Sequence, residues 1–112
     1  MTTLTTREQY EELKNKVDTY IIYKHSPTCL ESAKAYIQME ISEEIINIYI
    51  LDVLNTWNLK HDIANDLDIT HESPQAIMIK DKKIVSEAHH QSISTGRVKQ
   101  YILWWNDNRK NN

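Results

Sequence analysis

A strand, a turn and a helix that meet at the only cysteine constrain the fold of this chain more than any other stretch. Thr19–Lys24 is a run of β-branched and aromatic side chains, typical of a strand buried on both faces. The Ser-Pro dipeptide at 26–27 predicts a turn. Apolar residues then recur at helical spacing, and Thr28 with Glu31 three residues later predicts a capping box. We therefore expect a helix that begins at Cys29.

A cysteine in the first turn of a helix is placed for redox chemistry. The first backbone N–H groups have no helical partner and lie at the positive end of the helix dipole, and both features favour the thiolate over the thiol. Ser32 lies on the same face as Cys29, so the pair reads as Cys-x-x-Ser, half of a Cys-x-x-Cys redox pattern. Lone cysteines are often inert core residues, but the strand–turn–helix position favours a reactive one.

Composition excludes several classes of function. The net charge of −3 gives no electrostatic footprint for nucleic acid or an anionic membrane surface. No apolar run approaches the roughly 20 residues of a membrane span, and we find no signal peptide. One cysteine rules out an internal disulfide framework, so we expect a cytoplasmic protein. The single glycine, Gly96, excludes glycine-rich phosphate loops.

Hydrophobic periodicity and turn residues predict one α/β domain over residues 1–112. The expected elements are a helix at 6–17, a strand at 19–24, a helix at 29–41, a strand at 45–53, a helix at 58–67, strands at 75–80 and 83–88, and a helix at 95–107. Parallel strands with crossover helices, followed by a hairpin and a helix, predict a three-layer fold with a central four-stranded mixed sheet. This order, with a cysteine after the first parallel strand, is that of the thioredoxin fold. Pro74 lies where such proteins carry a cis-proline, and we predict a cis Ser73–Pro74 bond.

Short motifs along the chain carry a family resemblance. They are Lys24-His25-Ser26, Thr28-Cys29, Ser32, Asp52-Val53, His71-Glu72-Ser73-Pro74-Gln75-Ala76, and His90 followed by Ile93-Ser94. Together they resemble the monothiol bacilliredoxin (YtxJ-like) family, thioredoxin-fold proteins of bacillithiol-using Firmicutes. The likeness extends from about Tyr20 to Trp105. Leu30-Glu31 departs from the Pro-Ile that often follows the family's cysteine, and Gln91 stands where an aromatic residue is common.

The resemblance implies a thiol–disulfide oxidoreductase that reverses mixed disulfides between protein cysteines and bacillithiol. Cys29 would be the nucleophile and Pro74 the cis-proline. The implied partners are S-thiolated client proteins and bacillithiol, a co-substrate rather than a bound cofactor. Glu31 places a carboxylate close to the sulfur, which opposes thiolate formation.

The remaining site residues are assigned to substrate binding: Lys24, Thr28, Ser32, Ser73, Pro74 and His90. Lys24 ends a strand, where it either faces the cysteine turn or is solvated. His90, like His71, lies on a loop that this fold places near the cysteine, and either could shape a groove. His25 either tunes the thiol or is a polar turn residue. The histidines lack the usual spacing of metal ligands, so we expect no metal site.

Two alternatives to the oxidoreductase remain open. A thioredoxin-fold binding module whose cysteine is merely modified would show negligible thiol exchange. A monothiol cluster carrier would need ligands from another chain or from small thiols. We assign Trp57, Trp104 and Trp105 to packing.

Overall fold

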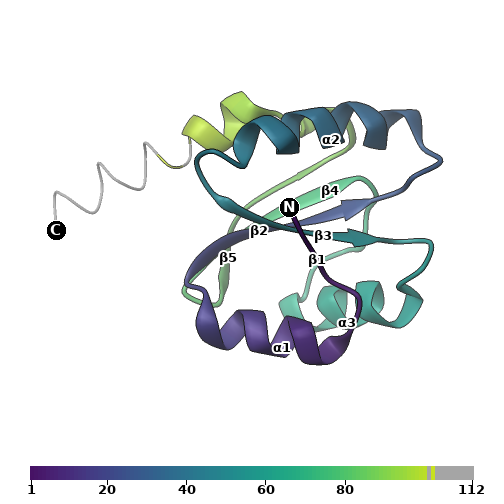
Figure 1. The fold of residues 1–112 in the computed structure, drawn as a ribbon, viewed down its shortest axis with the longest axis vertical. Coiled ribbons are helices and arrows are strands. Elements are labelled where there is room, and N and C mark those ends of the chain that lie inside the picture. Colours follow the sequence, from purple (N-terminus) through teal and green to yellow (C-terminus); the bar gives the residue numbers. More distant parts are fainter. Residues whose placement is uncertain (101, 103–112) are drawn as a thin grey trace, which may run out of the picture.

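A mixed β-sheet lies between two layers of helices (Figure 1). The computed structural model describes residues 1–100 and 102. Its elements are β1 (Thr2–Thr3), α1 (Arg7–Lys16), β2 (Thr19–His25), α2 (Leu30–Ser42), β3 (Asn47–Asp52), α3 (Trp57–Leu67), β4 (Gln75–Lys80), β5 (Lys83–His89) and the 3-10 turn η1 (His90–Ser92). Residues 95–100 are helical as well. The sheet order is β1-β3-β2-β4-β5, with β1, β3 and β2 parallel and β4 and β5 antiparallel to their neighbours.

The α/β fold and its element order are as predicted, except that the sheet has five strands instead of four. The additional strand is the two-residue β1, which pairs with Tyr49 and Ile50 of β3. Both of its residues are exposed threonines. A two-residue polar strand has no apolar alternation, so the hydrophobic pattern could not reveal it.

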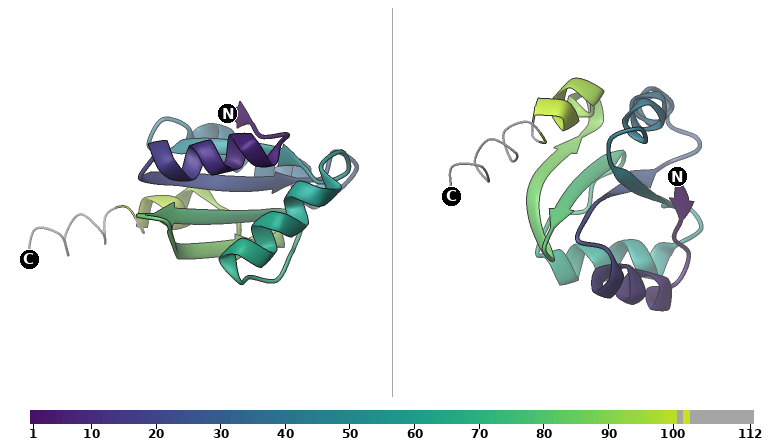
Figure 2. Two further views of the ribbon diagram at one scale, coloured as in Figure 1. Left: turned by 90° about the horizontal axis from the view of Figure 1, so that it is seen from below. Right: turned by 60° about the vertical axis from the view of Figure 1, so that its left-hand side comes forward.

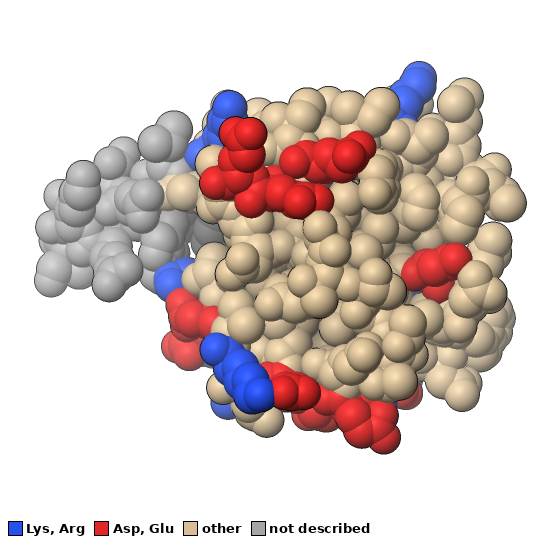
Figure 3. All heavy atoms as spheres, in the orientation of Figure 1, with Lys and Arg blue, Asp and Glu red and all other residues tan. Residues whose placement is uncertain are grey.

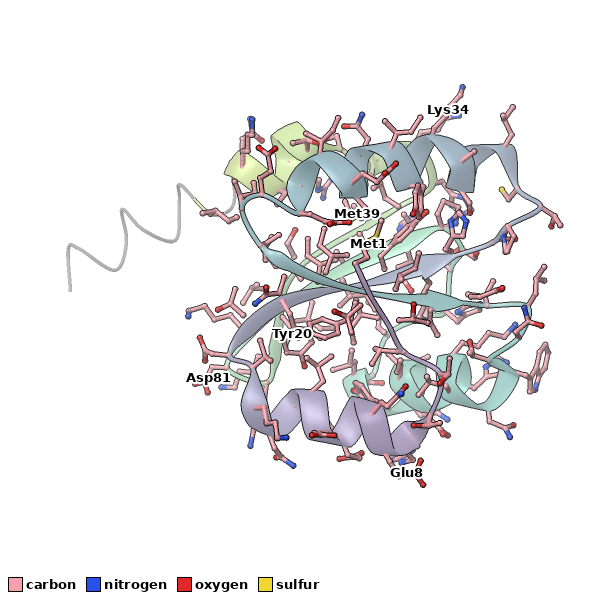
Figure 4. The ribbon with its side chains drawn as sticks, in the orientation of Figure 1. Met1, Glu8, Tyr20, Lys34, Met39 and Asp81 are labelled. Carbon is pink, nitrogen blue, oxygen red and sulfur yellow. The ribbon has the colours of Figure 1, made fainter. Side chains whose placement is uncertain are left out.

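Each face of the sheet packs against its own helices. In Figure 2, α1 and α3 cover one face, and α2 and the helix that begins at residue 95 cover the other. Alternate residues of β2 point to opposite layers, so Ile21 and Tyr23 pack with α2 while Tyr20 and Ile22 pack with α1 and α3. Figure 4 shows Met39 of α2 directed toward the sheet, whereas Lys34 points away to solvent.

Two local signals give the predicted structure. At the start of α1, Thr6 accepts a hydrogen bond from the backbone N–H of Gln9, and the Gln9 side chain in turn accepts one from the backbone N–H of Thr6, so the capping box is confirmed. Between β4 and β5, Asp81 and Lys82 form the two-residue connection, with φ values of 51° and 66°. Positive φ at both positions is the geometry of a type I′ hairpin turn.

The buried face of α2 contains polar residues as well as apolar ones. It consists of Ser32, Ala35, Met39 and Ser42, while Ala33 and Ile37 lie in solvent. Two of the buried residues are serines, so apolar spacing alone does not reveal the full buried face of the helix. The Ser42 hydroxyl is satisfied within the helix because it donates to the backbone oxygen of Gln38 at 2.9 Å.

Charge is spread over the molecule without a basic patch on the face seen in Figure 3. There the carboxylates gather over α2 and over α1, neutral side chains fill the space between, and basic side chains are scattered. Within residues 1–100 and 102, no helix is both long enough and apolar enough to cross a membrane.

Candidate functional site

The cysteine turn and the proline loop lie at the same edge of the sheet, which here means the edge formed by the carboxyl end of β2 and the amino end of β4. β2 runs toward this edge and β4 runs away from it, and Lys24 near the end of β2 pairs with Gln75 at the start of β4. The residues that follow β2 and those that precede β4 therefore meet beyond the same ends of the strands. β3 also ends here, where the backbone N–H of Val53 donates to the oxygen of His25 at 3.0 Å.

Cys29 is the N-cap residue of α2. Its φ and ψ of −102° and 128° are those of an extended residue, and its backbone oxygen accepts the first helical hydrogen bond, from Ala33 N–H at 3.1 Å. The predicted capping box of Thr28 and Glu31 is wrong, because the helix begins one residue later, at Leu30. A side chain at the N-cap lies near the unpaired amides of the first turn, although Cys29 makes no side-chain hydrogen bond to them. The partly exposed sulfur is thus better placed for anionic chemistry than one inside the helix.

A buried hydrogen-bond network supports the turn that carries Cys29. The phenol of Tyr23 donates to the backbone oxygen of Ser32 at 3.0 Å and contacts His25 Nδ1 at 2.9 Å. Since that phenol proton is used toward Ser32, His25 Nδ1 carries the proton of the second bond. Burial raises the pKa of Tyr23 and lowers the pKa of His25, so both groups are neutral near pH 7.

Ser32 fixes the turn from the other side. It is fully buried, and its hydroxyl accepts a hydrogen bond from the backbone N–H of Ser26 at 3.1 Å. Thr28 in contrast is exposed on the turn. Their assignment to substrate binding stays a prediction for both residues.

Pro74 follows a cis peptide bond, as predicted, and is buried. The loop before it is fastened by Gln75, whose side chain donates to the backbone oxygen of Thr70 at 3.1 Å and to Glu87 at 3.2 Å. Ser73 Oγ is buried and has no hydrogen-bond partner among the described residues. An unpaired buried hydroxyl is unfavourable, so Ser73 has hydrogen-bonding capacity that the described part of the chain leaves unused.

His90 connects the proline loop to α2. Its backbone N–H donates to the oxygen of Pro74 at 3.0 Å. Its ring lies between two carboxylates, with Nδ1 2.8 Å from Glu31 Oε2 and Nε2 3.1 Å from Glu72 Oε2. These hydrogen bonds, that to Glu31 first, raise the pKa of His90. The prediction that His90 lies beside the cysteine helix is consistent with these contacts, although its side chain is engaged by protein groups.

Lys24 is fully buried rather than solvated. Its Nζ lies 3.1 Å from Nδ1 of His71, in the segment that leads to Pro74. Burial lowers the pKa of Lys24 to about 8, and burial together with the nearby Lys24 charge lowers the pKa of His71 to about 4. At pH 7 a charged lysine therefore donates to a neutral imidazole. Whether Lys24 binds substrate stays a prediction.

Two residues at this edge have roles that sequence reasoning missed or misjudged. Trp57, which we assigned to packing, is 66% exposed at the start of α3, and its ring stacks with Lys60 Nζ 4.2 Å from the ring centroid. Glu72 was part of a family motif but had no assigned role, and its partner His90 lies 18 residues away.

Trp104 and Trp105 lie outside the described residues. In the part of the chain that the structure describes, no group of three or more His, Cys, Asp or Glu residues is arranged to hold a metal ion.

Comparison with known proteins identifies the family. The family model described as "Monothiol bacilliredoxin BrxC" matches residues 2–98. The chain belongs to the monothiol bacilliredoxin family. The match includes Cys29, the Pro74 loop and His90, the residues that meet at the edge of the sheet described above. Membership of this family, together with the thioredoxin fold, indicates a thiol redox function.

Solved structures support the same fold. A candidate oxidoreductase with a thioredoxin fold is 29% identical, with a TM-score of 0.84, over 89% of this chain and 91% of that one. Thioredoxin from Fasciola hepatica is 20% identical, with a TM-score of 0.70, over 92% of this chain and 97% of that one. Thioredoxin from Trypanosoma brucei brucei is 13% identical, with a TM-score of 0.70, over 91% of this chain and 87% of that one. The two thioredoxins bear on the fold alone.

Proposed function

We propose that this bacilliredoxin removes bacillithiol from S-bacillithiolated proteins in the cytoplasm by a monothiol mechanism through Cys29. The observation that carries the proposal is the position of the chain's one thiol. It caps α2 at the edge of the sheet where the Pro74 loop also lies, in a chain of this family. The supporting chemistry is that of thiol–disulfide exchange, which needs an accessible thiolate and room for in-line attack.

The cycle consists of two exchanges. In the first, the Cys29 thiolate attacks the bacillithiol sulfur of the client's mixed disulfide, a Cys29–bacillithiol disulfide forms, and the client cysteine leaves as a thiolate. In the second, the thiolate of a free bacillithiol attacks the bacillithiol sulfur on Cys29, which releases Cys29 as a thiolate and forms bacillithiol disulfide. The net result is that the client's mixed disulfide is reduced, and its bacillithiol leaves joined to the second one as bacillithiol disulfide. No second protein cysteine takes part.

The protein groups around the sulfur have separate roles in this cycle. The first-turn amides of α2 stabilise the thiolate that attacks and later leaves. Ser73 precedes the cis bond to Pro74, and its backbone is the group that we expect to contact an extended substrate beside Cys29. Thr28 is exposed and directly precedes Cys29, so we expect it to contact the bound substrate. Ser32 stands where a resolving thiol would be, so a hydroxyl there leaves the second step to bacillithiol.

A turnover assay tests the proposal. A bacillithiolated client is incubated with excess bacillithiol and with catalytic amounts of wild type, Cys29→Ala or Ser32→Ala, and the free client thiol is measured over time. We expect wild type to release the client thiol, Cys29→Ala to be indistinguishable from the reaction without protein, and Ser32→Ala to remain active. If wild type gives no rate above the background, the binding-module reading replaces the oxidoreductase.

A further inference from the structure

The His90 side chain has two carboxylate acceptors at once. Nδ1 lies 2.8 Å from Glu31, and Nε2 lies 3.1 Å from Glu72. Ionised carboxylates accept hydrogen bonds and cannot donate them, and a neutral imidazole carries only one N–H. Both contacts are hydrogen bonds only when both ring nitrogens are protonated. The arrangement, called here the Glu31–His90–Glu72 bridge, is therefore that of an imidazolium between two carboxylates.

The bridge spans the elements that form the cysteine site. Glu31 lies in the first turn of α2, two residues after Cys29, and Glu72 lies two residues before Pro74. The backbone of His90 is tied to the Pro74 oxygen as well. His90, which directly follows β5, thus joins the helix that carries Cys29 to the Pro74 loop. Its φ of 52° places the backbone of His90 in the left-handed region.

Charge is the second consequence of the bridge. A thiolate at Cys29 would lie two residues before Glu31, whose carboxylate is linked through the His90 ring to that of Glu72. His89 and Glu87 of β5 lie beside His90, and Lys24 and His71 interact with the charge of Glu72. The His89 ring meets the His90 ring edge-on at 5.5 Å, and its Nδ1 is 2.8 Å from Glu87. The pKa of His71, lowered to about 4, leaves that ring neutral near pH 7. The positive charge that directly contacts both carboxylates is that of His90.

We propose that His90, as an imidazolium, is a positioning residue of the Cys29 site that joins α2 to the Pro74 loop and offsets part of the carboxylate charge beside the sulfur, so that anionic reactants approach it more readily. The inference rests on the proposed function only in naming that reactant, because the thiolate that resolves the Cys29 adduct is an anion. A loss of the His90 charge should therefore slow anionic partners of Cys29 more than neutral ones.

The test is the ratio of two alkylation rates. Iodoacetate is anionic and iodoacetamide is neutral, and each forms one carbon–sulfur bond to the Cys29 thiolate as iodide leaves. Both reagents use the same thiolate, so the ratio cancels the fraction of Cys29 that is ionised and reports the charge around the sulfur. The variant of choice is His90→Asn, which is neutral and which tolerates positive φ well. His89→Asn is the matched control on the adjacent residue.

At low salt and pH 6, we expect His90→Asn to lower the iodoacetate-to-iodoacetamide ratio about three-fold, the size of a unit charge several ångströms away in a watery site. His90→Lys should keep the wild-type ratio, since this chain already places a lysine at positive φ at Lys82. The difference should vanish in 1 M salt, where screening extends over only about 3 Å. His89→Asn should behave as wild type.

The pH profile separates charge from shape. The ordinary pKa of histidine is about 6.5, and the pKa of His90 is raised above it. As the pH rises through this raised pKa, the ring loses a proton and one carboxylate loses its hydrogen-bond donor. The wild-type ratio should fall over this range, whereas the ratios of His90→Asn and His90→Lys should stay flat. An unchanged ratio in His90→Asn, a loss that persists in 1 M salt, or an equal loss in His89→Asn would overturn the inference. The alkylation test uses no bacillithiol, so none of these results contradicts the proposed function. Conversely, a failed turnover assay would not change the alkylation ratio that is expected for His90→Asn.

Discussion

At the scale of single residues, two buried polar side chains of β2 support the Cys29 site through specific partners. Tyr23 and Lys24 are neighbours in β2 and both are fully buried, yet they point to opposite faces of the sheet. Tyr23 holds the first turn of α2 through Ser32, and Lys24 holds the segment before Pro74 through His71. β2 thus supports both the cysteine turn and the Pro74 loop.

Tyr23→Phe should destabilise the protein by about 1–2 kcal/mol, because it removes a phenol that pairs with the Ser32 oxygen and His25 Nδ1 in a buried place. The free energy of unfolding in urea measures the change. Tyr36→Phe is the matched control, since it keeps the ring that packs on His25 with centroids 5.3 Å apart. Equal losses for the two variants would show that the network beneath Cys29 contributes nothing specific.

Lys24→Met should stabilise the protein at pH 7 by about 1–3 kcal/mol, because it removes a charge that is buried against a neutral histidine. The gain should shrink from pH 8 toward pH 10. In this window the unfolded wild type holds a proton that the folded protein, with its Lys24 pKa of about 8, has lost, so wild-type stability rises with pH. Lys34→Met, at an exposed position of α2, should show no such pH dependence. A destabilised Lys24→Met at pH 7 would mean that the His71 contact outweighs the burial of the charge.

At the scale of elements, the β4–β5 turn offers a test that is independent of the site. Lys82 has a φ of 66°, which a side chain with a Cβ disfavours. Lys82→Gly should therefore raise the free energy of unfolding by about 0.5–1 kcal/mol. Lys83→Gly, one residue further into β5, should lower it, because glycine weakens a strand. If both variants are destabilised, the turn conformation is not that of a type I′ hairpin.

The elements also show how far sequence reasoning reaches. Long apolar runs, such as the one at β2, were predicted nearly to the residue because burial on both faces leaves a continuous signal. The start of α2 was misplaced because Thr28 and Glu31 have capping-box spacing, although Glu31 pairs with His90 instead. That pair is separated by 59 residues, so only the folded topology brings it together. Within the site, local sequence thus identified Cys29, while the contacts that surround it came from tertiary structure.

At the scale of the whole molecule, the sheet brings segments that are far apart in the sequence to one edge. The cysteine turn follows β2, the Pro74 loop precedes β4, and His90 follows β5, and the antiparallel pairing of β4 with its neighbours places these ends together. A family match over residues 2–98 covers all three segments. The one thiol of the chain lies in the first of these segments, and the proposed redox cycle passes through it and an external thiol.

Intact mass tests this claim most directly. Reduced wild type is mixed with an equimolar bacillithiolated client, the reaction is quenched with acid, and both proteins are weighed; free bacillithiol is then added to a second portion. The proposed cycle predicts that wild type gains one disulfide-linked bacillithiol on Cys29 as the client loses one, and that added bacillithiol returns the protein to its reduced mass. Cys29→Ala should gain nothing and leave the client modified. A client that is freed while wild type never carries the adduct, or that is freed by Cys29→Ala, would contradict a monothiol mechanism at Cys29.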